Sequence, residues 1–333
     1  NRLLEKNSIY YIQSMTKPIM SVAIMQLVER GKLNLADNAA DYYPPLKKLR
    51  VIKDLTTGIY GPTVSAKQPI TILQLLTHTS GLSHGLEETL FDQQLFKLMY
   101  NELFDPAEYN NLKERIDKLM LVPLIGQPGE QWYYSAAPDI LALILEKITG
   151  QSTETYLEEN IFDPLSMNET GYNVRLEQQQ RIMQVHFNLE DGTLVNSHVQ
   201  VPTTGNTVYG GTHGLFSSTE DFLKFCQMIL NKGSFNDQRI LKKETVELMT
   251  KNHVGELVGP GRGFGLGFGV LYDTDKDLSP ANTGQIYWGG YFKTHFFIDL
   301  KESLIAIIMT QKIPNTDEYI IELNRAVYGA LSF

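Results

Sequence analysis

The chain has 333 residues, of which 42% are hydrophobic and 20% charged, so it can bury a large core in one or two domains. Its net charge of −9 and the lack of a basic run make nucleic acid and anionic membrane surfaces poor candidate partners. The longest apolar runs, such as 304–309, have the length of a strand and are far too short to span a bilayer.

The first predicted elements are a short strand and a helix that meet near Ser14. Residues 9–12 form a β-branched and aromatic run, and from Ile19 to Val28 apolar residues recur at helical spacing as far as Gly31. This pattern predicts an amphipathic helix with Ser14 at or near its N-cap, where unpaired N–H groups and the helix dipole favour negative charge. Lys17 then lies on the same face about one turn later.

Ser14 and Lys17 form a Ser-x-x-Lys pair, which indicates nucleophilic catalysis by a hydroxyl beside an amine. The positive helix end and partial burial are expected to lower the lysine pKa, so that the amine accepts the serine proton. By itself the pair is weak evidence, because a capping serine followed by a surface lysine is ordinary. The rest of the chain has to decide between the two interpretations.

The middle of the chain is predicted to be mainly helical and the last third rich in strands. Helices are expected over about 71–78, 90–100, 112–121 and 138–148, a hairpin turn at 190–192, and a helix that Ser218 opens and Gly233 closes. Strands over 265–272, 285–288, 295–299 and 304–310 and a closing helix over 316–331 follow. The elements predict an α+β organisation in which a domain made from both chain ends, 1–62 plus 185–333, carries a helical insertion over 63–184.

Two further stretches carry candidate chemistry. Residues 128–135 form a Pro-Gly turn that delivers aromatic residues to a helix start. The turn is either a packed corner or the place of a tyrosine that acts with a lysine as general acid and base. In 287–291, paired glycines inside a strand predict either a bulge or close approach by another group, such as a substrate carbonyl directed at a strand N–H.

Three motifs occur in an order that resembles the signatures of family VIII carboxylesterases, in the serine β-lactamase-related (class C, penicillin-recognising) superfamily. The motifs are Ser14-Met15-Thr16-Lys17, Trp132-x-Tyr134-Ser135-x-Ala137-x-Asp139 and Trp288-Gly289-Gly290, and segments 75–82, 263–270 and 305–311 match as well. The resemblance covers nearly the whole chain and implies an antiparallel sheet flanked by helices, with a mainly helical inserted domain. Since the family begins with a strand pair and only 13 residues precede Ser14, we expect part of the sheet to lie before residue 1.

The resemblance also implies a role for each motif residue. Ser14 would be the nucleophile and Lys17 its proton acceptor, while Tyr134 would carry the proton to the leaving group and later activate water. Which of Lys17 and Tyr134 is the general base stays open. The backbone N–H groups of Ser14 and Tyr291 would form the oxyanion hole. The expected substrate-binding residues are Trp288, Gly289, Gly290 and His213; for His213, which lies in a glycine-rich loop, a packed or solvent-facing position is the alternative.

Two departures from the penicillin-binding pattern favour neutral esters as substrates. Ala136 stands where those relatives have an asparagine, and Trp288-Gly289-Gly290 stands where they have Lys-Thr-Gly. The asparagine helps to hold a β-lactam amide and the lysine its carboxylate, so the loss of both argues against efficient penicillin turnover. Residues 293–295, Lys-Thr-His, imitate the second motif, but histidine replaces the glycine that permits close approach.

Other patterns have simpler interpretations. Residues 81–85 fit the Gly-x-Ser-x-Gly nucleophile elbow around Ser83, but a predicted helix precedes them instead of a strand, so we expect a helix-terminating turn. The single cysteine, Cys226, excludes an internal disulfide and falls on a helical apolar stripe, which predicts a buried position. The seven histidines are scattered and there is no cysteine cluster, so we expect neither a metal nor a cofactor.

The predicted function is hydrolysis of small carboxylic esters through an acyl-enzyme on Ser14, with small-molecule esters or amides as substrates. β-Lactamase activity, cleavage of D-amino-acid peptides and acyl transfer stay open within the same chemistry. The alternative from another class is a catalytically silent scaffold or cell-wall-binding protein of the same fold.

Overall fold

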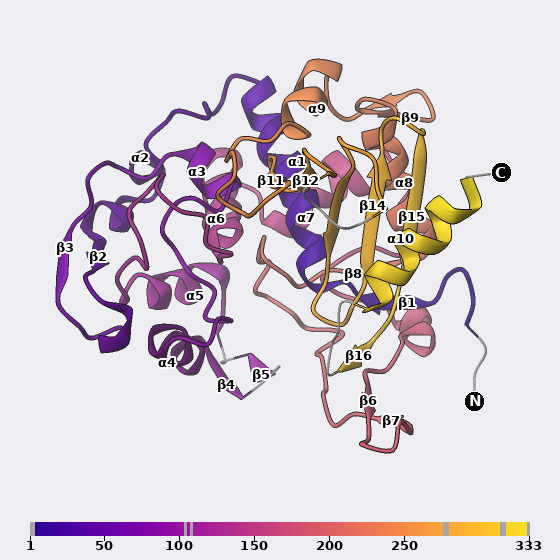
Figure 1. The fold of residues 1–333 in the computed structure, drawn as a ribbon, viewed down its shortest axis with the longest axis horizontal. Coiled ribbons are helices and arrows are strands. Elements are labelled where there is room, and N and C mark those ends of the chain that lie inside the picture. The colour runs from indigo at the N-terminus through magenta and orange to yellow at the C-terminus, as the bar shows by residue number, and fades with distance from the viewer. Residues whose placement is uncertain (1–3, 103–104, 107–108, 276–279, 314–317, 332–333) are drawn as a thin grey trace. The chain divides into compact units, whose positions relative to one another are not determined.

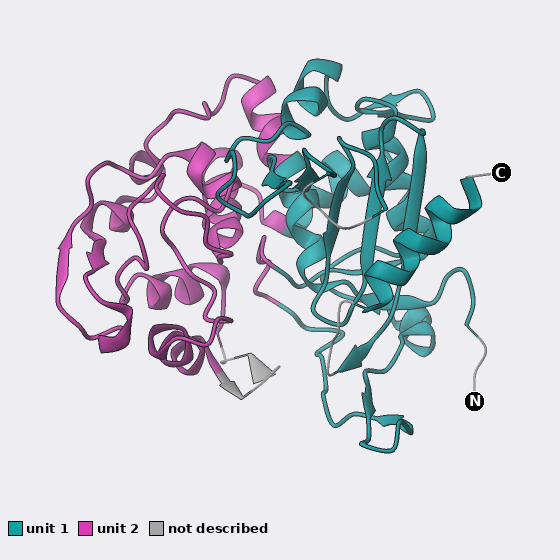
Figure 2. Ribbon diagram, in the orientation of Figure 1, with its two compact units in different colours: residues 1–22, 154–206, 213–333 teal, residues 23–153, 207–212 magenta. Residues whose placement is uncertain are grey.

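The computed structural model describes residues 4–102, 105–106, 109–275, 280–313 and 318–331. The chain forms two compact units (Figure 2): unit 1 is Asn1–Val22, Glu154–Asn206 and His213–Phe333, and unit 2 is Ala23–Thr153 and Thr207–Thr212. The expected domain division, 1–62 plus 185–333 against 63–184, has other bounds and stays a prediction. Among the described residues, no helix is both long enough and apolar enough to cross a membrane.

Unit 1 is built on a five-stranded antiparallel sheet in the order β11–β12–β13–β14–β15 (Figure 1). The register aligns Trp288 with Phe296, and Phe296 with Ile307. β14 is buried along its whole length, as expected of an inner strand whose two faces are both covered. The strands are β11 (Arg262–Phe264), β12 (Gly269–Leu271), β13 (Ile286–Gly289), β14 (His295–Asp299) and β15 (Leu304–Ile308).

Helices cover both faces of this sheet. Phe296 and Phe297 are neighbours on β14, so their side chains point to opposite faces. The Phe296 ring lies 5.0 Å from Phe222 on α8, whereas Phe297 stacks on Tyr328 of α10 at 5.8 Å. α8 and α10 therefore pack on opposite faces of the sheet.

The other strands of unit 1 form smaller sheets. β1 pairs with β8 and β6 with β7, both antiparallel, while β16 pairs with β6 in parallel. The helices are α1 (Thr16–Glu29, which continues into unit 2), α7 (Thr153–Leu157), α8 (Thr219–Leu230), α9 (Lys243–Met249) and α10 (Glu318–Leu331). The short strands are β1 (Ile9–Tyr11), β6 (His186–Asn188), β7 (Leu194–Asn196), β8 (Phe216–Ser218), β9 (Ser234–Phe235), β10 (Gln238–Arg239) and β16 (Lys312–Ile313).

The regular secondary structure of unit 2 is mainly helical. α6 is its central helix and contacts both α3 and α5. Its ends follow the expected chemistry, with Pro138 in the first turn and Gly150 in the left-handed conformation beyond the last. The helices are α2 (Ala39–Tyr42), α3 (Ile72–Leu76), α4 (Leu90–Met99), α5 (Leu112–Leu119) and α6 (Ala137–Thr149), and the short strands are β2 (Arg50–Ile52), β3 (Thr63–Ser65), β4 (Tyr100–Glu102) and β5 (Asp105–Pro106).

The structure confirms the predicted α+β class with its antiparallel sheet and differs from the expected elements at two points. In the strand expected over 265–272, only Gly269–Leu271 (β12) is a strand, and residues 265–268 form the turn of a hairpin. In this hairpin Phe264 of β11 pairs with Gly269 of β12, and the Gly265 N–H donates to Phe268 O at 2.8 Å. Closely spaced glycines weaken a continuous strand and permit this turn. The second difference is α1, which was expected to be amphipathic but buries its polar residues Ser21 and Gln26 together with its apolar ones.

Candidate active site

Ser14 lies between β1 and α1, in a single 3₁₀ turn formed by Gln13–Met15. The Met15 N–H donates to Ile12 O at 3.1 Å, and the Thr16 hydroxyl donates to Gln13 O at 2.7 Å. The turn begins at Gln13, whose φ of 50° falls in the left-handed region that residues other than glycine seldom adopt. The α-helix itself begins at Thr16, so Ser14 lies two residues ahead of its first residue, near the N-cap as expected.

Lys17 reaches back to Ser14 within this first turn. Its Nζ lies 3.1 Å from Ser14 Oγ, a hydrogen bond that the three-residue spacing allows. Only 1% of Lys17 is exposed, which is more complete burial than the sequence predicts. Lysine is almost never buried to this extent without a partner, and Ser14 Oγ is a partner of the buried amine.

The paired glycines at the end of β13, Gly289 and Gly290, let the sheet approach the chain next to Ser14. The Gly290 N–H donates to Thr294 O at 2.7 Å. A Cβ on Gly290 would lie 2.4 Å from Ile12 O and 2.3 Å from Thr294 Oγ1, so only glycine fits without displacement. Thr294 Oγ1 in turn donates to Ile12 O at 3.3 Å. Of the two interpretations of these glycines, the structure shows close approach, and the partner is the chain's own backbone.

The Gln311 side chain holds β1 from the other end of the sequence. Its Oε1 accepts from the Tyr11 N–H at 3.2 Å, and its Nε2 donates to Tyr11 O at 3.1 Å. The amide group thus makes the two hydrogen bonds that a neighbouring strand would make. Since Tyr11 is three residues from Ser14, this contact fixes the approach of the chain to the 3₁₀ turn.

The other predicted residues of unit 1 have identifiable neighbours. His213 Nδ1 lies 3.3 Å from the Tyr11 hydroxyl, so His213 packs against the segment that leads to Ser14. Trp288 meets Phe264 edge to face at 5.1 Å. Tyr291 is half-buried, and burial raises the pKa of its phenol above the usual value, so the phenol stays protonated at neutral pH.

Tyr134 belongs to unit 2 and lies in the loop that enters α6. Its ring centre is 5.2 Å from that of His78, 5.6 Å from that of His84 and 6.3 Å from that of Trp132. His78 and His84 were not among the predicted site residues. The signal that could have found His78 is its place in the segment 75–82, which matches the family pattern.

Ser83, at the centre of the Gly-x-Ser-x-Gly pattern, has a structural partner. It follows α3, its hydroxyl donates to Asp92 Oδ1 at 2.5 Å, and it accepts from the Gly85 N–H at 3.1 Å. Both side chains are buried, and Thr89 donates to the other Asp92 oxygen at 2.5 Å. The serine therefore satisfies a buried carboxylate and ties the loop to α4.

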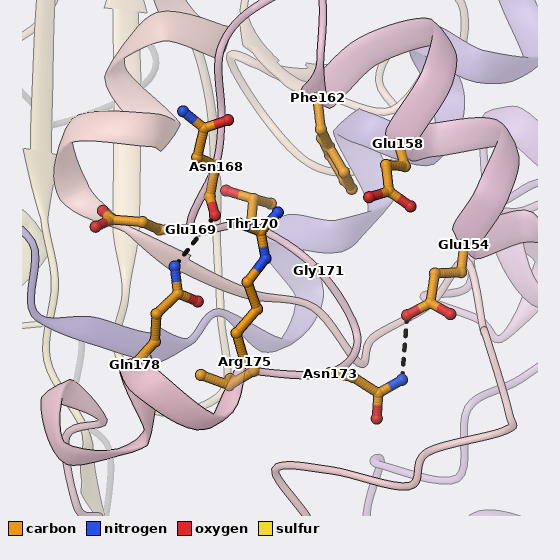
Figure 3. A pocket seen from close by; sticks show the side chains of 11 residues that line it. Glu154, Glu158, Phe162, Asn168, Glu169, Thr170, Gly171, Asn173, Arg175 and Gln178 are labelled. Carbon is orange, nitrogen blue, oxygen red and sulfur yellow. Dashed lines mark hydrogen bonds between the residues drawn. The ribbon is translucent and has the colours of Figure 1, made fainter.

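A separate small cavity in unit 1 contains none of these residues (Figure 3). Its volume is about 70 Å³, and its walls include the side chains of Glu154, Glu158 and Arg175. Asn173 donates to Glu154 at 3.1 Å and Gln178 donates to Asn168 O at 3.3 Å, as the dashed lines show. The size and polarity suit a few water molecules and not an acyl chain.

Comparison with known proteins places this chain in a family. The family model described as Beta-lactamase matches residues 1–328, and the chain belongs to that family. Protein Rv1367c of Mycobacterium tuberculosis (strain ATCC 25618 / H37Rv) is 31% identical over 331 residues, which cover 94% of this chain and 79% of the relative. Esterase EstB of Burkholderia gladioli is 26% identical over 332 residues, covering 93% and 79%.

A solved structure gives the same fold. EstCE1, a hydrolase with promiscuous acyltransferase activity, has a TM-score of 0.82 at 22% identity, with 98% of this chain and 86% of that chain covered. The superfamily and the β-lactamase-like fold predicted from the three motifs are therefore confirmed, and so is the enzyme class, a serine hydrolase.

Proposed function

We propose that this protein hydrolyses small carboxylic esters through an acyl-enzyme on Ser14. The observation that carries the proposal is the 3.1 Å contact between Lys17 Nζ and Ser14 Oγ, made by an almost fully buried lysine. A nucleophile and a base within hydrogen-bond reach are the basic requirement of covalent catalysis. That Esterase EstB is a relative along 93% of this chain agrees with this function.

The proposed reaction has two halves. Ser14 Oγ attacks the ester carbonyl carbon while Lys17 Nζ takes the hydroxyl proton, and the carbon–oxygen bond to the alcohol breaks. Tyr134 passes the proton to the departing alcohol oxygen. In the second half, water attacks the acyl carbon while the same groups take its proton. The bond from that carbon to Ser14 Oγ then breaks and the proton returns to Oγ, which releases the carboxylic acid and restores Ser14.

The oxyanion hole is proposed to consist of the backbone N–H groups of Ser14 and Tyr291. The hydrogen bond from the Gly290 N–H to Thr294 O supports Tyr291, which lies in the turn between β13 and β14, as the second donor, because the preceding amide is already used within the hairpin. Two donors directed at the developing negative charge are what acyl transfer requires.

Neutral esters fit the side chains better than penicillins do. The segment that corresponds to Lys-Thr-Gly contributes Trp288, Gly289 and Gly290, an aromatic and two small residues without charge. His213, through its contact with Tyr11, is proposed to line the same region. Ala136 offers no amide for a β-lactam side chain.

Chemical labelling tests the proposal. The protein is mixed with p-nitrophenyl acetate or p-nitrophenyl butyrate, the reaction is quenched, and the acylated residue is located by peptide mass spectrometry. We expect a burst of p-nitrophenol, steady turnover and an acyl group on Ser14, all absent from Ser14→Ala. A label on Ser83, or turnover that survives in Ser14→Ala, would overturn the assignment.

The same experiment separates the alternatives. Adding methanol partitions an acyl-enzyme between water and alcohol, so a strong preference for the methyl ester would indicate an acyltransferase. Faster turnover of nitrocefin or of a D-alanyl peptide than of the esters would indicate a β-lactamase or peptidase. A folded protein with neither label nor turnover would indicate the silent scaffold or cell-wall-binding protein.

A further inference from the structure

We propose that the segment Thr77–Gly85 positions Tyr134, with His78 and His84 as the positioning residues. This inference rests on the catalytic role proposed for Tyr134 and concerns how the fold holds its ring. All the groups involved belong to unit 2.

The backbone of this segment brackets Tyr134 on both sides. The Tyr133 N–H donates to His78 O at 2.9 Å, and the Ala136 N–H donates to Ser83 O at 3.3 Å. The residue before Tyr134 and the second residue after it are thus bonded to one loop. Two further hydrogen bonds join the same segments earlier in the chain: the Gly129 N–H donates to Thr79 O at 2.7 Å, and the Ile125 N–H donates to Gly81 O at 2.7 Å.

The segment Thr77–Gly85 and the loop of residues 125–136 are packed so closely that a side chain is excluded at Gly81. A Cβ there would lie 2.1 Å from Gly126 O, and Gly81 has a φ of +80°. Both the space and the backbone conformation therefore require glycine at this point. Neither loop can shift past the other without breaking this contact.

His78 is held in an unfavourable conformation to make its contacts. Its φ is +57° although it is not glycine, and only 2% of it is exposed. Its Nδ1 lies 2.8 Å from Ser135 Oγ, next to Tyr134 in the chain, and its ring meets Trp132 edge to face at 5.9 Å. Strained backbone of this kind persists where the surrounding structure imposes it, and it occurs most often at functional sites.

His84 supplies a second imidazole against the same tyrosine. It is 9% exposed, and its ring meets the Tyr134 ring at an interplanar angle of 65° with the centres 5.6 Å apart. Edge-to-face contacts of this geometry are among the favourable ones between aromatic rings. With the His78 ring 5.2 Å away, two imidazoles restrict the directions in which the Tyr134 ring can turn.

Restricting Tyr134 matters because proton transfer is sensitive to position. A misplacement of about 1 Å can reduce a catalysed rate roughly 10²-fold. Loss of either ring is therefore expected to lower kcat, the rate of the chemical steps, while leaving KM almost unchanged. If the two histidines had a purely structural role, their loss would lower the melting temperature without this selective fall in kcat.

The test compares ring-removing and ring-keeping variants in the full chain, with p-nitrophenyl butyrate as substrate. We expect His84→Ala and His84→Gln to lower kcat about 10- to 100-fold with KM within about 3-fold, and His84→Phe to stay within about 3-fold of the parent. His78→Asn should behave like His84→Ala, because asparagine tolerates the left-handed backbone but has no ring. His253→Ala, a histidine of unit 1 that bonds to Leu248 O at 2.8 Å, is the matched control.

Tyr134→Phe, measured in parallel, separates the catalytic role proposed for Tyr134 from the positioning role proposed for His78 and His84. If Tyr134→Phe keeps full kcat, the catalytic role of Tyr134 is wrong and the positioning role falls with it. If Tyr134→Phe loses activity while folded His84→Gln and His78→Asn keep it, only the positioning role is wrong. A His84→Phe variant as slow as His84→Gln would also overturn ring packing as the mechanism.

Discussion

The two groups of residues assigned to catalysis are held in different ways. In unit 1, Ser14 and Lys17 are three residues apart and meet through a single helical turn. In unit 2, Tyr134 lies in a loop, and a second loop holds it through contacts such as that between His78 and Ser135, which are 57 residues apart. One arrangement is local in the sequence and the other is not.

This difference shows which parts of such a site tolerate change. A helical turn brings Lys17 to Ser14 whatever the rest of the chain does, so substitutions elsewhere should affect where the pair lies and not the pair itself. Tyr134 has no such local support, and its position depends on the contacts between its own loop and the loop 77–85. The segment that leads to Ser14 also depends on a distant part of the chain, because Gln311 contacts Tyr11 across 300 residues.

The largest effect should come from breaking the local pair. Lys17→Met keeps most of the volume and removes the amine, so we expect kcat/KM for p-nitrophenyl butyrate to fall roughly 10²- to 10⁴-fold. Lys293→Met, in the segment that imitates Lys-Thr-Gly, is the matched control and should change kcat/KM by less than about 3-fold. A larger loss in Lys293→Met than in Lys17→Met would mean that the imitated motif is the functional one.

A second substitution tests the long-range contact beside Ser14. Gly290→Ala places a methyl group 2.4 Å from Ile12 O, so we expect the free energy of unfolding to fall by about 1–3 kcal/mol and the folded protein to lose activity. In Gly289→Ala the nearest atom is Thr294 O at 3.1 Å, and the effect should be smaller. Urea unfolding and ester turnover measure both. Equal losses in the two variants would contradict the assigned contact.

In unit 2, Ser83→Ala should affect stability and leave the site of acylation unchanged. The substitution removes a hydrogen bond to the buried Asp92 carboxylate, so the free energy of unfolding should fall by about 1–3 kcal/mol. The acyl label from p-nitrophenyl acetate should stay on Ser14. Loss of all labelling in a folded Ser83→Ala protein would instead favour the nucleophile elbow.

The smallest effect concerns pH and the helix that covers the sheet of unit 1. Burial alone would raise the pKa of Asp299, but hydrogen bonds from Tyr328, Asn282 and two backbone N–H groups lower it below the usual value. The carboxylate therefore stabilises the fold above the pKa of an unfolded aspartate, and this contribution is lost as the pH falls through the lower, folded-state value.

Asp299→Asn tests this prediction through the free energy of unfolding measured from pH 7 down to pH 3. The difference between parent and variant should be largest near neutral pH and shrink on acidification. Glu322→Gln, an exposed α10 residue that bonds to Arg325 at 2.8 Å, is the control and should show little change. A difference that grows as the pH falls would have the wrong sign.

Much of the candidate site could be predicted from the sequence because its signals are local. The Ser14–Lys17 spacing, the turn at Pro128-Gly129 and the ends of α6 are properties of short segments, and three motifs in order identified the family. The strand predicted over 265–272 began four residues too early, because only residues 269–271 form β12. Alternating glycines have the period of a strand, and only pairing with neighbours shows where the strand breaks.

The amino-acid sequence by itself therefore determined the class of enzyme, the candidate nucleophile and the residue one helical turn away. Tertiary structure decided how completely Lys17 is buried, that Gly290 meets Ile12, and that the loop 77–85 holds Tyr134. The physical reason is that helical spacing and capping act within a few residues. Close approach and burial depend on which distant segments the fold brings together, and no local pattern records that.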